Sequence, residues 1–405
     1  MTTVTPPAHP LLEDARAILP DVRAIRRGLH AIPEVGLQLP LTQALVAEAI
    51  RKLNLEPRLG TTVSSVVATI EGHGPGPTIL LRADMDGLPL TEVTGLTFSS
   101  EHDGRMHACG HDTHVAMLLG AARLLQERRA TWPGRVLLMF QPGEEGFHGA
   151  RYMLDEGLLD ASGGERPSGA FALHISTMYR TGTIDVRPGP MLASSDTLRI
   201  IVKGRGGHAS TPHLALDPIT VAAEIVLGFQ AMITRRVDVF DPAVVTIAQF
   251  VAGTTTNIIP ESAWLGGTMR TISEATRMAV RADVRRVAAG IAAAHGAEVE
   301  VDIEPGYPVT VNDPVFTELV LSAAREVLGE DDVIQVPAPI MGAEDFSYVL
   351  QQVPGTIAFV GARPAGEDPA TAPMNHSNRV VFDDSAMAVG VATYVAVALR
   401  HLGGG

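Results

Sequence analysis

Residues 115–140 read VAMLLGAARLLQERRATWPGRVLLMF. In the first half, from Val115 to Arg128, apolar residues recur at helical spacing, which predicts an α-helix. In the second half, from Arg135 to Phe140, a mostly apolar run predicts a buried strand. A helix followed by a strand of this kind is typical of layered α/β domains.

The residues before this stretch continue the alternation. Apolar residues at helical spacing run from Leu11 to Leu29 and from Leu41 to Leu53. Short β-rich runs follow at Ser65 to Ile70 and at Thr78 to Arg82. We therefore expect an α/β fold with a mostly parallel sheet in the first part of the chain.

From about Thr183 the pattern changes to strand, helix, strand, strand, helix, strand. The predicted ranges are Thr197–Lys203, Pro218–Ile233, Val244–Phe250, Ala263–Arg270, Glu274–His295 and Ala297–Ile303. Two strand–helix–strand units in a row predict a compact α+β domain of ferredoxin-like type. After Asn312 the pattern returns to helix, short strand and helix.

The length of 405 residues is large for one compact core and predicts two domains. The chemistry of the first half needs a late histidine, as argued below, so we interpret the middle block as an insertion. The predicted catalytic domain comprises 1–184 and 304–405, and the predicted inserted domain comprises 185–303.

The composition narrows the function classes. Hydrophobic residues make up 46% and charged residues 19%, which fits a globular protein. The formal net charge of −14 disfavours a nucleic-acid partner. The one cysteine, Cys109, excludes an internal disulfide and suits the cytoplasm. Without a run of ~18 apolar residues or a signal-peptide pattern at residues 1–10, we expect no membrane association.

The densest chemical stretch is HACGHDTH, residues 107–114. Thiolate and imidazole are the usual ligands of zinc and similar divalent ions. Apolar helix positions follow directly, so the group is expected at a helix start, where the helix dipole favours a thiolate. The alternative is a histidine-rich loop that enters a helix.

A second element, QPGEEG at residues 141–146, follows an apolar strand. It is expected at the carboxyl end of that strand, where open α/β sheets bind ligands. One carboxylate could ligate a metal while its neighbour acts as general base. Adjacent carboxylates in a loop are otherwise often simply solvated.

Further candidates end other strands or precede the last helix. Asp86 lies in RADMDG, His174 follows an apolar run, and His376 lies in the loop PMNHS. Taken alone, either histidine fits a structural role better than a ligand role. Together they complete the predicted ligand set Cys109, His111, Glu145, His174 and His376. Five protein ligands exceed the three typical of one catalytic zinc, which favours two metals.

Seven motifs then support a resemblance: RADMDGLPL (82–90), GRMHACGHDTHVAML (104–118), QPGEEG (141–146), GRGGHASTPH (204–213), TTNIIP (255–260), GTMRT (267–271) and MGAEDFS (341–347). With these motifs in this order, the chain resembles the aminoacylase/carboxypeptidase family of di-metal amidohydrolases. It is most similar to the branch with hippurate hydrolase, N-acyl-L-amino acid amidohydrolases and auxin-conjugate hydrolases. The resemblance spans nearly the whole chain and implies a catalytic domain of zinc-exopeptidase type with an inserted lid or dimerisation domain.

The resemblance also implies residue roles. It implies Glu144 as general base, Glu145 as ligand and Cys109 as the bridging or shared ligand. It implies that His208 stabilises the oxyanion, in its own or a neighbouring subunit, and that Asp86 orients the metal site. Substrate contacts are implied for Asn257, Arg270 and the backbone near Gly342.

The residues themselves leave simpler alternatives open. His208 follows three glycines that let the backbone approach a ligand, or it is a solvated turn histidine. Asn257 could satisfy its own loop, and Arg270 could form a salt bridge. QPGEEG and Met374-Asn375 depart from the commoner family pattern at positions that affect acyl-group preference.

We therefore expect metal-dependent hydrolysis of the amide bond of small-molecule N-acyl-L-amino acids, with acetyl, benzoyl or indoleacetyl groups. Two divalent ions per subunit are expected, manganese or zinc, with cobalt and nickel also compatible. The resemblance implies a homodimer or homotetramer. A metallo-carboxypeptidase or dipeptidase is the alternative enzyme, and a metal-dependent binding protein is the alternative without catalysis. The chain lacks His-Glu-x-x-His and Gly-x-Ser-x-Gly, which argues against single-zinc proteases and serine hydrolases.

Overall fold

The computed structural model describes residues 9–403, which divide into two compact units. The first unit contains the described residues up to Met191, Val311–Ala338, and the residues from Tyr348 on. The second unit contains Leu192–Thr310 and Pro339–Ser347. The sequence places the insertion at 185–303, and the short segment 339–347 is an addition that its pattern did not indicate.

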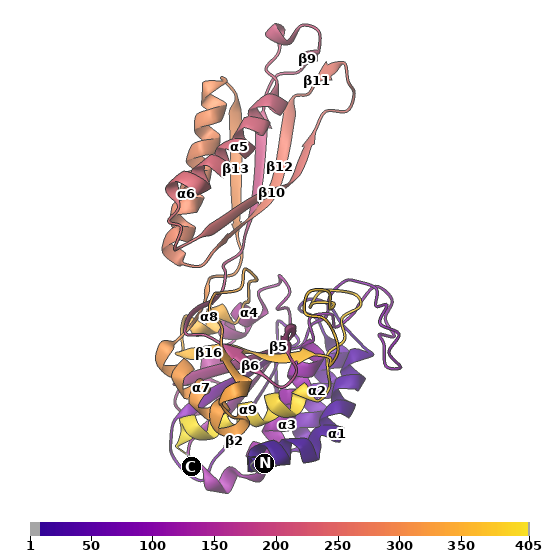
Figure 1. The fold of residues 1–405 in the computed structure, drawn as a ribbon, viewed down its shortest axis with the longest axis vertical. Coiled ribbons are helices and arrows are strands. Elements are labelled where there is room, and N and C mark those ends of the chain that lie inside the picture. The colour runs from indigo at the N-terminus through magenta and orange to yellow at the C-terminus, as the bar shows by residue number, and fades with distance from the viewer. Residues whose placement is uncertain (1–8, 404–405) are drawn as a thin grey trace, which may run out of the picture. The chain divides into compact units, whose positions relative to one another are not determined.

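The first unit is built on an eight-stranded sheet with the order β1-β2-β4-β3-β5-β16-β6-β15 (Figure 1). The bounds are β1 Arg58–Leu59, β2 Val66–Glu71, β3 Thr78–Asp84, β4 Arg135–Gln141, β5 Gly169–Arg180, β6 Ile184–Val186, β15 Val333–Gln335 and β16 Gly355–Arg363. The four central strands β4, β3, β5 and β16 are parallel, which confirms the predicted mostly parallel α/β sheet. Because the central strands are covered on both faces, every residue of β3 is buried.

Helices cover this sheet. The bounds are α1 Pro10–His30, α2 Pro40–Lys52, α3 His111–Glu127, α4 Gly149–Asp155, α7 Pro314–Leu328, α8 Ser347–Leu350 and α9 Ala386–Leu402, with 3₁₀ turns η1 Arg129–Thr131, η2 Leu158–Asp160 and η4 Glu330–Asp332. In Figure 1, the indigo α1 and the yellow α9 pack with α3, and α3 and α9 also contact β3 and β5. Helix α9 is apolar over most of its length and is almost wholly buried.

One tyrosine of α9 separates two central strands. Pairing between β3 and β5 stops at Arg82 and Ala172. Beyond that point the hydroxyl of Tyr394 accepts the N–H of Leu173 at 3.0 Å and donates to the carbonyl of Arg82 at 2.7 Å. The hydroxyl therefore satisfies the backbone groups that the strands no longer share. The two strands part just before Asp84 and His174, which leaves room at their carboxyl ends.

Helix α3 begins four residues earlier than the predicted Val115, at His111. Gly110 caps it with φ +89°, a conformation that favours glycine. A Cβ at this position would lie 2.4 Å from Cγ2 of Ile175, so no larger residue fits. Cys109 therefore precedes the N-cap residue of the helix, and His111 occupies the first turn.

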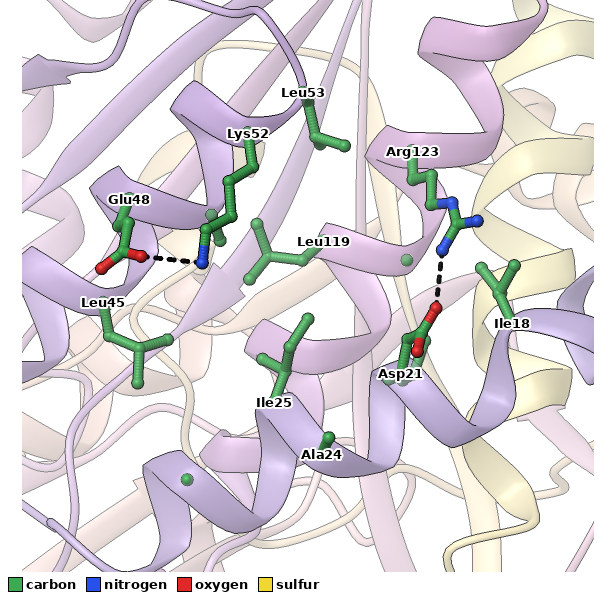
Figure 2. A pocket seen from close by; sticks show the side chains of 14 residues that line it. Ile18, Asp21, Ala24, Ile25, Leu45, Glu48, Lys52, Leu53, Leu119 and Arg123 are labelled. Atoms are coloured by element: carbon green, nitrogen blue, oxygen red, sulfur yellow. Dashed lines mark hydrogen bonds and ion pairs between the residues drawn. The ribbon is translucent and has the colours of Figure 1, made fainter.

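A surface cavity of ≈ 390 Å³ lies between α1, α2 and α3 (Figure 2). Its floor is apolar, with Ile25 and Leu119 among the lining residues. Two ion pairs flank it, Lys52 with Glu48 at 2.7 Å and Arg123 with Asp21 at 2.8 Å. None of its lining residues is a predicted site residue.

The second unit has a four-stranded antiparallel sheet with the order β10-β12-β8-β13 and the helices α5 and α6. The bounds are β8 Asp196–Lys203, η3 Pro212–Leu214, α5 Pro218–Arg236, β10 Ala243–Ala252, β12 Ser262–Thr271, α6 Glu274–Ala294 and β13 Glu298–Pro305. This is the ferredoxin-like arrangement that the sequence predicts. Alternate residues of β8, Leu198, Ile200 and Val202, join the unit's apolar core.

Two small sheets complete the structure. Strands β9 (Gly207–His208) and β11 (Ile258–Ile259) pair in the second unit, and β7 (Gly189–Leu192) pairs with β14 (Thr310–Asn312). Within residues 9–403, no helix has both the length and the apolar character that a membrane crossing requires.

Candidate metal centre

The five predicted ligands lie together at the carboxyl edge of the first unit's central strands. The Sγ of Cys109 lies 3.4 Å from Nε2 of His174 and 3.2 Å from Nε2 of His376. The same nitrogen of His376 lies 3.2 Å from Oε1 of Glu145. Residues that are far apart in the sequence thus place a thiol, two imidazoles and a carboxylate within contact distance.

His111 completes the group. It is fully buried, and its Nε2 lies 3.6 Å from Oδ2 of Asp84 and 3.9 Å from Oε1 of Glu145. Among the described residues this nitrogen makes no hydrogen bond. A buried polar atom without a hydrogen-bond partner lowers the stability of the fold. A cation between this nitrogen and the nearby carboxylates would give all of these atoms a partner.

Two overlapping groups of three residues, here called triads, could each hold a metal ion. Within each triad the three ligand atoms lie within 4.8 Å of one another. One comprises Cys109, His111 and His174, and the other comprises Cys109, Glu145 and His376. Both share the sulfur of Cys109. Thiolate, imidazole and carboxylate suit zinc, manganese and similar ions, so the donor set fits two neighbouring divalent cations.

The electrostatics of the cluster also favour cations. Burial raises the pKa of the Cys109 thiol, and the carboxylates of Glu145 and Glu144 raise it further. Burial alone would lower the pKa of His111, but Asp84, Asp86 and Glu145 outweigh it and raise that pKa to about 10. Negative charge is therefore concentrated in a buried space, where a divalent ion would neutralise it and favour the thiolate.

Asp86 holds the loop that carries the two glutamates. Its Oδ1 accepts the N–H of Glu144 at 3.0 Å, and its Oδ2 accepts the N–H of Glu145 at 3.1 Å. Asp86 also lies 3.4 Å from Nδ1 of His111. With only 1% of its surface exposed, Asp86 links the strand end, the glutamate loop and the first turn of α3.

The glutamate loop closes tightly on itself. Gly149 donates its N–H to the carbonyl of Gly143 at 3.0 Å. A Cβ on Gly149 would lie 1.6 Å from the carbonyl oxygen of Pro142, so only glycine fits. Within this loop the predicted base Glu144 is buried beside Glu145, and the two form a further group with His111.

Sequence reasoning missed a buried polar group behind the ligands. Nη1 of Arg82 donates to Asp84 at 2.6 Å, and Asp84 lies 2.5 Å from Nδ1 of His114. The N–H of Ile175 donates to Nε2 of His114 at 2.7 Å, so the proton of this imidazole sits on Nδ1. The available signal was an arginine and an aspartate inside the otherwise apolar strand Thr78–Asp84.

A second missed group links α1 to α3, the helix that carries the predicted ligand His111. Asp112 accepts a hydrogen bond from Nε of Arg26 at 3.0 Å and lies 2.9 Å from Nδ1 of His30. Burial lowers the pKa of His30, yet Asp112 and Glu92 raise it to about 9. No local pattern indicates this pairing, because the partners come from helices far apart in the sequence.

The remaining predicted site residues lie in the second unit. His208 pairs with Ile258 across β9 and β11, and Ala209 donates its N–H to the carbonyl of Asn257 at 3.0 Å. The structure thus places His208 and Asn257 side by side. Both are exposed, and Nδ1 of His208 accepts the N–H of Ser210 at 3.1 Å.

Arg270 and Gly342 are separate from that pair. Arg270 lies on β12 opposite Val244, half buried, and burial lowers its pKa. No ion pair of Arg270 is present among residues 9–403, so the simple salt-bridge alternative has no support there. Gly342 lies in the segment 339–347, and its carbonyl accepts the N–H of Ala193 at 2.8 Å.

The chain is similar to several known proteins. The model for peptidase family M20/M25/M40 matches residues 80–400. Thermostable carboxypeptidase 1 of Saccharolobus solfataricus is 38% identical over 394 residues, which cover 96% of this chain and 98% of that protein. N-acetylcysteine deacetylase of Bacillus subtilis is 40% identical over 347 residues, which cover 85% of this chain and 88% of that protein.

A solved structure is similar over the whole chain. The Bacillus subtilis YXEP protein, described as a dinuclear metal binding peptidase from the M20 family, has a TM-score of 0.81 and 34% identity. The similarity covers 96% of this chain and 99% of that one. These findings confirm the family resemblance of the motifs. The chain is a hydrolytic enzyme that belongs to peptidase family M20/M25/M40.

Proposed function

We propose that this enzyme uses two divalent metal ions to hydrolyse the amide bond of N-acyl-L-amino acids, releasing a carboxylic acid and a free amino acid. The observation that carries the proposal is the pair of ligand triads that share Cys109, with Glu144 beside them. The similarity to a deacetylase of N-acetylcysteine supports the acyl-amino acid substrate. The similarity to a dinuclear metal binding peptidase supports two ions.

The proposed ligands are the five residues of the two triads, Cys109, His111, Glu145, His174 and His376. Two divalent ions held by these residues would supply a water of lowered pKa and would polarise the amide carbonyl. We propose manganese or zinc, and cobalt or nickel would suit the same donors. Cys109 is the shared ligand, because its sulfur lies within 3.4 Å of His174 and 3.2 Å of His376.

Glu144 is the proposed general base. It takes the proton of the attacking water and returns it to the nitrogen of the leaving amino acid. Asp86 orients it through the backbone hydrogen bond at 3.0 Å. Glu144 suits this role because proton transfer requires a fixed distance to the reacting water. Its carboxylate is buried next to the proposed ligands, and its backbone N–H is held by Asp86.

The second unit is the proposed source of the remaining contacts. His208 stabilises the oxyanion, in its own or a neighbouring subunit of a homodimer or homotetramer. Its Nδ1 accepts from Ser210, which leaves Nε2 as the nitrogen that carries the proton and donates. Asn257, Arg270 and the backbone near Gly342 hold the free carboxylate of the substrate. The inserted unit, 185–303 in the sequence interpretation, acts as lid and dimerisation domain.

The alternative function is a metallo-carboxypeptidase or dipeptidase that uses the same residues. The similarity to a thermostable carboxypeptidase favours it. The chemistry of amide cleavage is the same, so only the group on the nitrogen side of the amino acid distinguishes the two. The single cysteine supports a cytoplasmic location for either function.

A substrate panel on chelator-treated enzyme tests the proposal. Acetyl-, benzoyl- and indoleacetyl-amino acids are compared with dipeptides, with and without added Mn²⁺ or Zn²⁺. Metal-dependent release of amino acid from the acyl compounds, at kcat/KM above that for dipeptides, is the expected result. Faster cleavage of dipeptides would establish the alternative. No hydrolysis of any amide with metal restored would refute both.

A further inference from the structure

Asn375 immediately precedes the ligand His376 in the loop between β16 and α9. Its Nδ2 donates to the carbonyl of Cys109 at 3.0 Å and to the carbonyl of Ile175 at 2.9 Å. Its Oδ1 accepts the N–H of Thr177 at 3.4 Å. One side-chain amide therefore uses both of its donors and its acceptor on backbone groups at the metal centre.

These bonds join the chain segments that carry three different ligands. Cys109 is itself a ligand, Ile175 follows the ligand His174, and Asn375 precedes His376. The carbonyl of Ile175 also lies 2.8 Å from Nδ1 of His174. A carbonyl that accepts from Nδ1 keeps the proton there and leaves Nε2 free as the ligand atom. Asn375 fixes the position of that carbonyl.

The backbone of His376 needs such support. Its φ is +70°, in the left-handed region that non-glycine residues rarely adopt. Its side chain is 55% exposed, whereas that of Glu145 opposite it is 13% exposed. Packing therefore does not hold this ligand. A strained backbone persists only when surrounding interactions maintain it. Two interactions do so here. The N–H of His376 donates to the carbonyl of Ala108 at 2.9 Å, and the side-chain amide of Asn375 bonds the carbonyl of Cys109.

We propose that Asn375 is a positioning residue that sets the spacing of Cys109, His174 and His376, and thereby the affinity of the centre for its metal ions. The inference rests on the proposed function, because it concerns the same two ions. It adds to that centre a residue whose side-chain amide bonds backbone groups of the ligand-bearing segments. It also gives a physical role to the Met374-Asn375 departure noted in the sequence.

Asn375→Ala removes all three hydrogen bonds, and Asn375→Asp keeps the shape while placing an acceptor against two carbonyl oxygens. We expect both variants to bind Mn²⁺ and Zn²⁺ about 10- to 100-fold more weakly in chelator competition. Because lost hydrogen bonds also weaken the fold, we expect a somewhat lower thermal midpoint of the metal-free protein in both variants. The weaker metal binding is the effect specific to the proposed role. Asn378→Ala is the matched control, because Asn378 lies in the same loop and its backbone carbonyl accepts the N–H of Val93. Its side chain makes no hydrogen bond within residues 9–403.

Co²⁺ binding gives a second readout that needs no catalysis. The near-ultraviolet charge-transfer band of bound Co²⁺ reports thiolate coordination by Cys109, and its visible bands report the coordination geometry. We expect a changed spectrum in both Asn375 variants and an unchanged one in Asn378→Ala. Wild-type metal affinity and an unaltered spectrum in the Asn375 variants would overturn the inference while leaving the proposed function intact. If both variants kept wild-type metal affinity, and if Asn375→Asp lowered the thermal midpoint of the metal-free protein as strongly as Asn375→Ala, the role of Asn375 would be purely structural. If the unaltered protein binds no divalent ion, the proposed function itself fails.

Discussion

The Sγ of Cys109 lies 3.2 Å from Nε2 of His376, although the two residues are 267 positions apart in the chain. The same sulfur belongs to both ligand triads, whereas His376 belongs to one. Replacing the cysteine therefore removes a ligand from both proposed ions, and replacing the histidine removes a ligand from a single ion.

The first prediction follows from this difference. Cys109→Ala should lower the occupancy of both ions, and His376→Ala should lower the occupancy of one. Elemental analysis after equilibration at a fixed free-metal concentration measures the metal content per chain. An unchanged content in Cys109→Ala would remove the cysteine from the ligand set.

The second prediction concerns the two adjacent glutamates. Glu144→Gln should retain metal and fold while kcat falls by a factor of ~10²–10⁴, because a general base contributes about that much. Glu145→Gln is the paired control and should lose metal instead, since Oε1 of Glu145 contacts His376. Near-normal kcat in Glu144→Gln with full metal content would show that another group is the base.

A third prediction tests how the glutamate loop is held. Asp86→Ala leaves the N–H groups of Glu144 and Glu145 without their acceptor, and hydrogen bonds to a charged group contribute about 1.5–3 kcal/mol each. We expect a lower kcat together with a lower thermal midpoint. Asp86→Asn keeps one acceptor oxygen, so its kcat and its thermal midpoint should lie between those of Asp86→Ala and those of the wild type. If Asp86→Ala matched the wild type in both kcat and midpoint, the loop would be held by other contacts.

The fourth prediction concerns Asp185, a carboxylate on β6 with 3% of its surface exposed. Burial raises the pKa of Asp185 to about 6. A hydrogen bond from the Thr183 hydroxyl to Oδ2 of Asp185, at 2.5 Å, lowers this pKa by a smaller amount. Since the folded pKa exceeds the unfolded value, the native state binds more protons between these values. The contribution of Asp185 to stability therefore decreases as pH rises towards 6 and is least favourable above it.

Asp185→Asn removes that pH-dependent cost. The variant should be stabilised relative to the wild type, and the gain should be larger at pH 8 than at pH 5, by roughly 1 kcal/mol, because pH 5 lies below the folded pKa and pH 8 lies above it. Denaturant unfolding of both proteins at the two pH values measures the difference. An equal gain at both pH values would show that Asp185 does not titrate in this range.

Local patterns predicted much of the fold. The expected helix Leu11–Leu29 is found at Pro10–His30, and the expected strand Thr78–Arg82 is found at Thr78–Asp84. Both carry an apolar periodicity that is complete within one element. The start of α3 was placed too late, because a histidine-rich turn has no apolar periodicity before Val115.

The parts that sequence reasoning did not supply depend on distant partners. Short strands such as β6 gain their stability from neighbours, so three residues carry too little pattern to identify them. Asn375 and Asp112 have no local signal, because their roles depend on where Cys109 and Arg26 lie in space. The predicted ligands lie together because strand ends and helix starts converge in an α/β layer.

The order of strands has a consequence for how the chain acquires its structure. Strand β16 lies between β5 and β6 in the sheet, yet it follows the whole stretch Leu192–Thr310 in the chain. The four main strands of the second unit, by contrast, fall between Asp196 and Pro305. During synthesis the second unit can close its sheet first, while β5 and β6 keep open edges until Gly355–Arg363 has emerged. The interval before β16 emerges is therefore when the growing chain depends most on protection from aggregation.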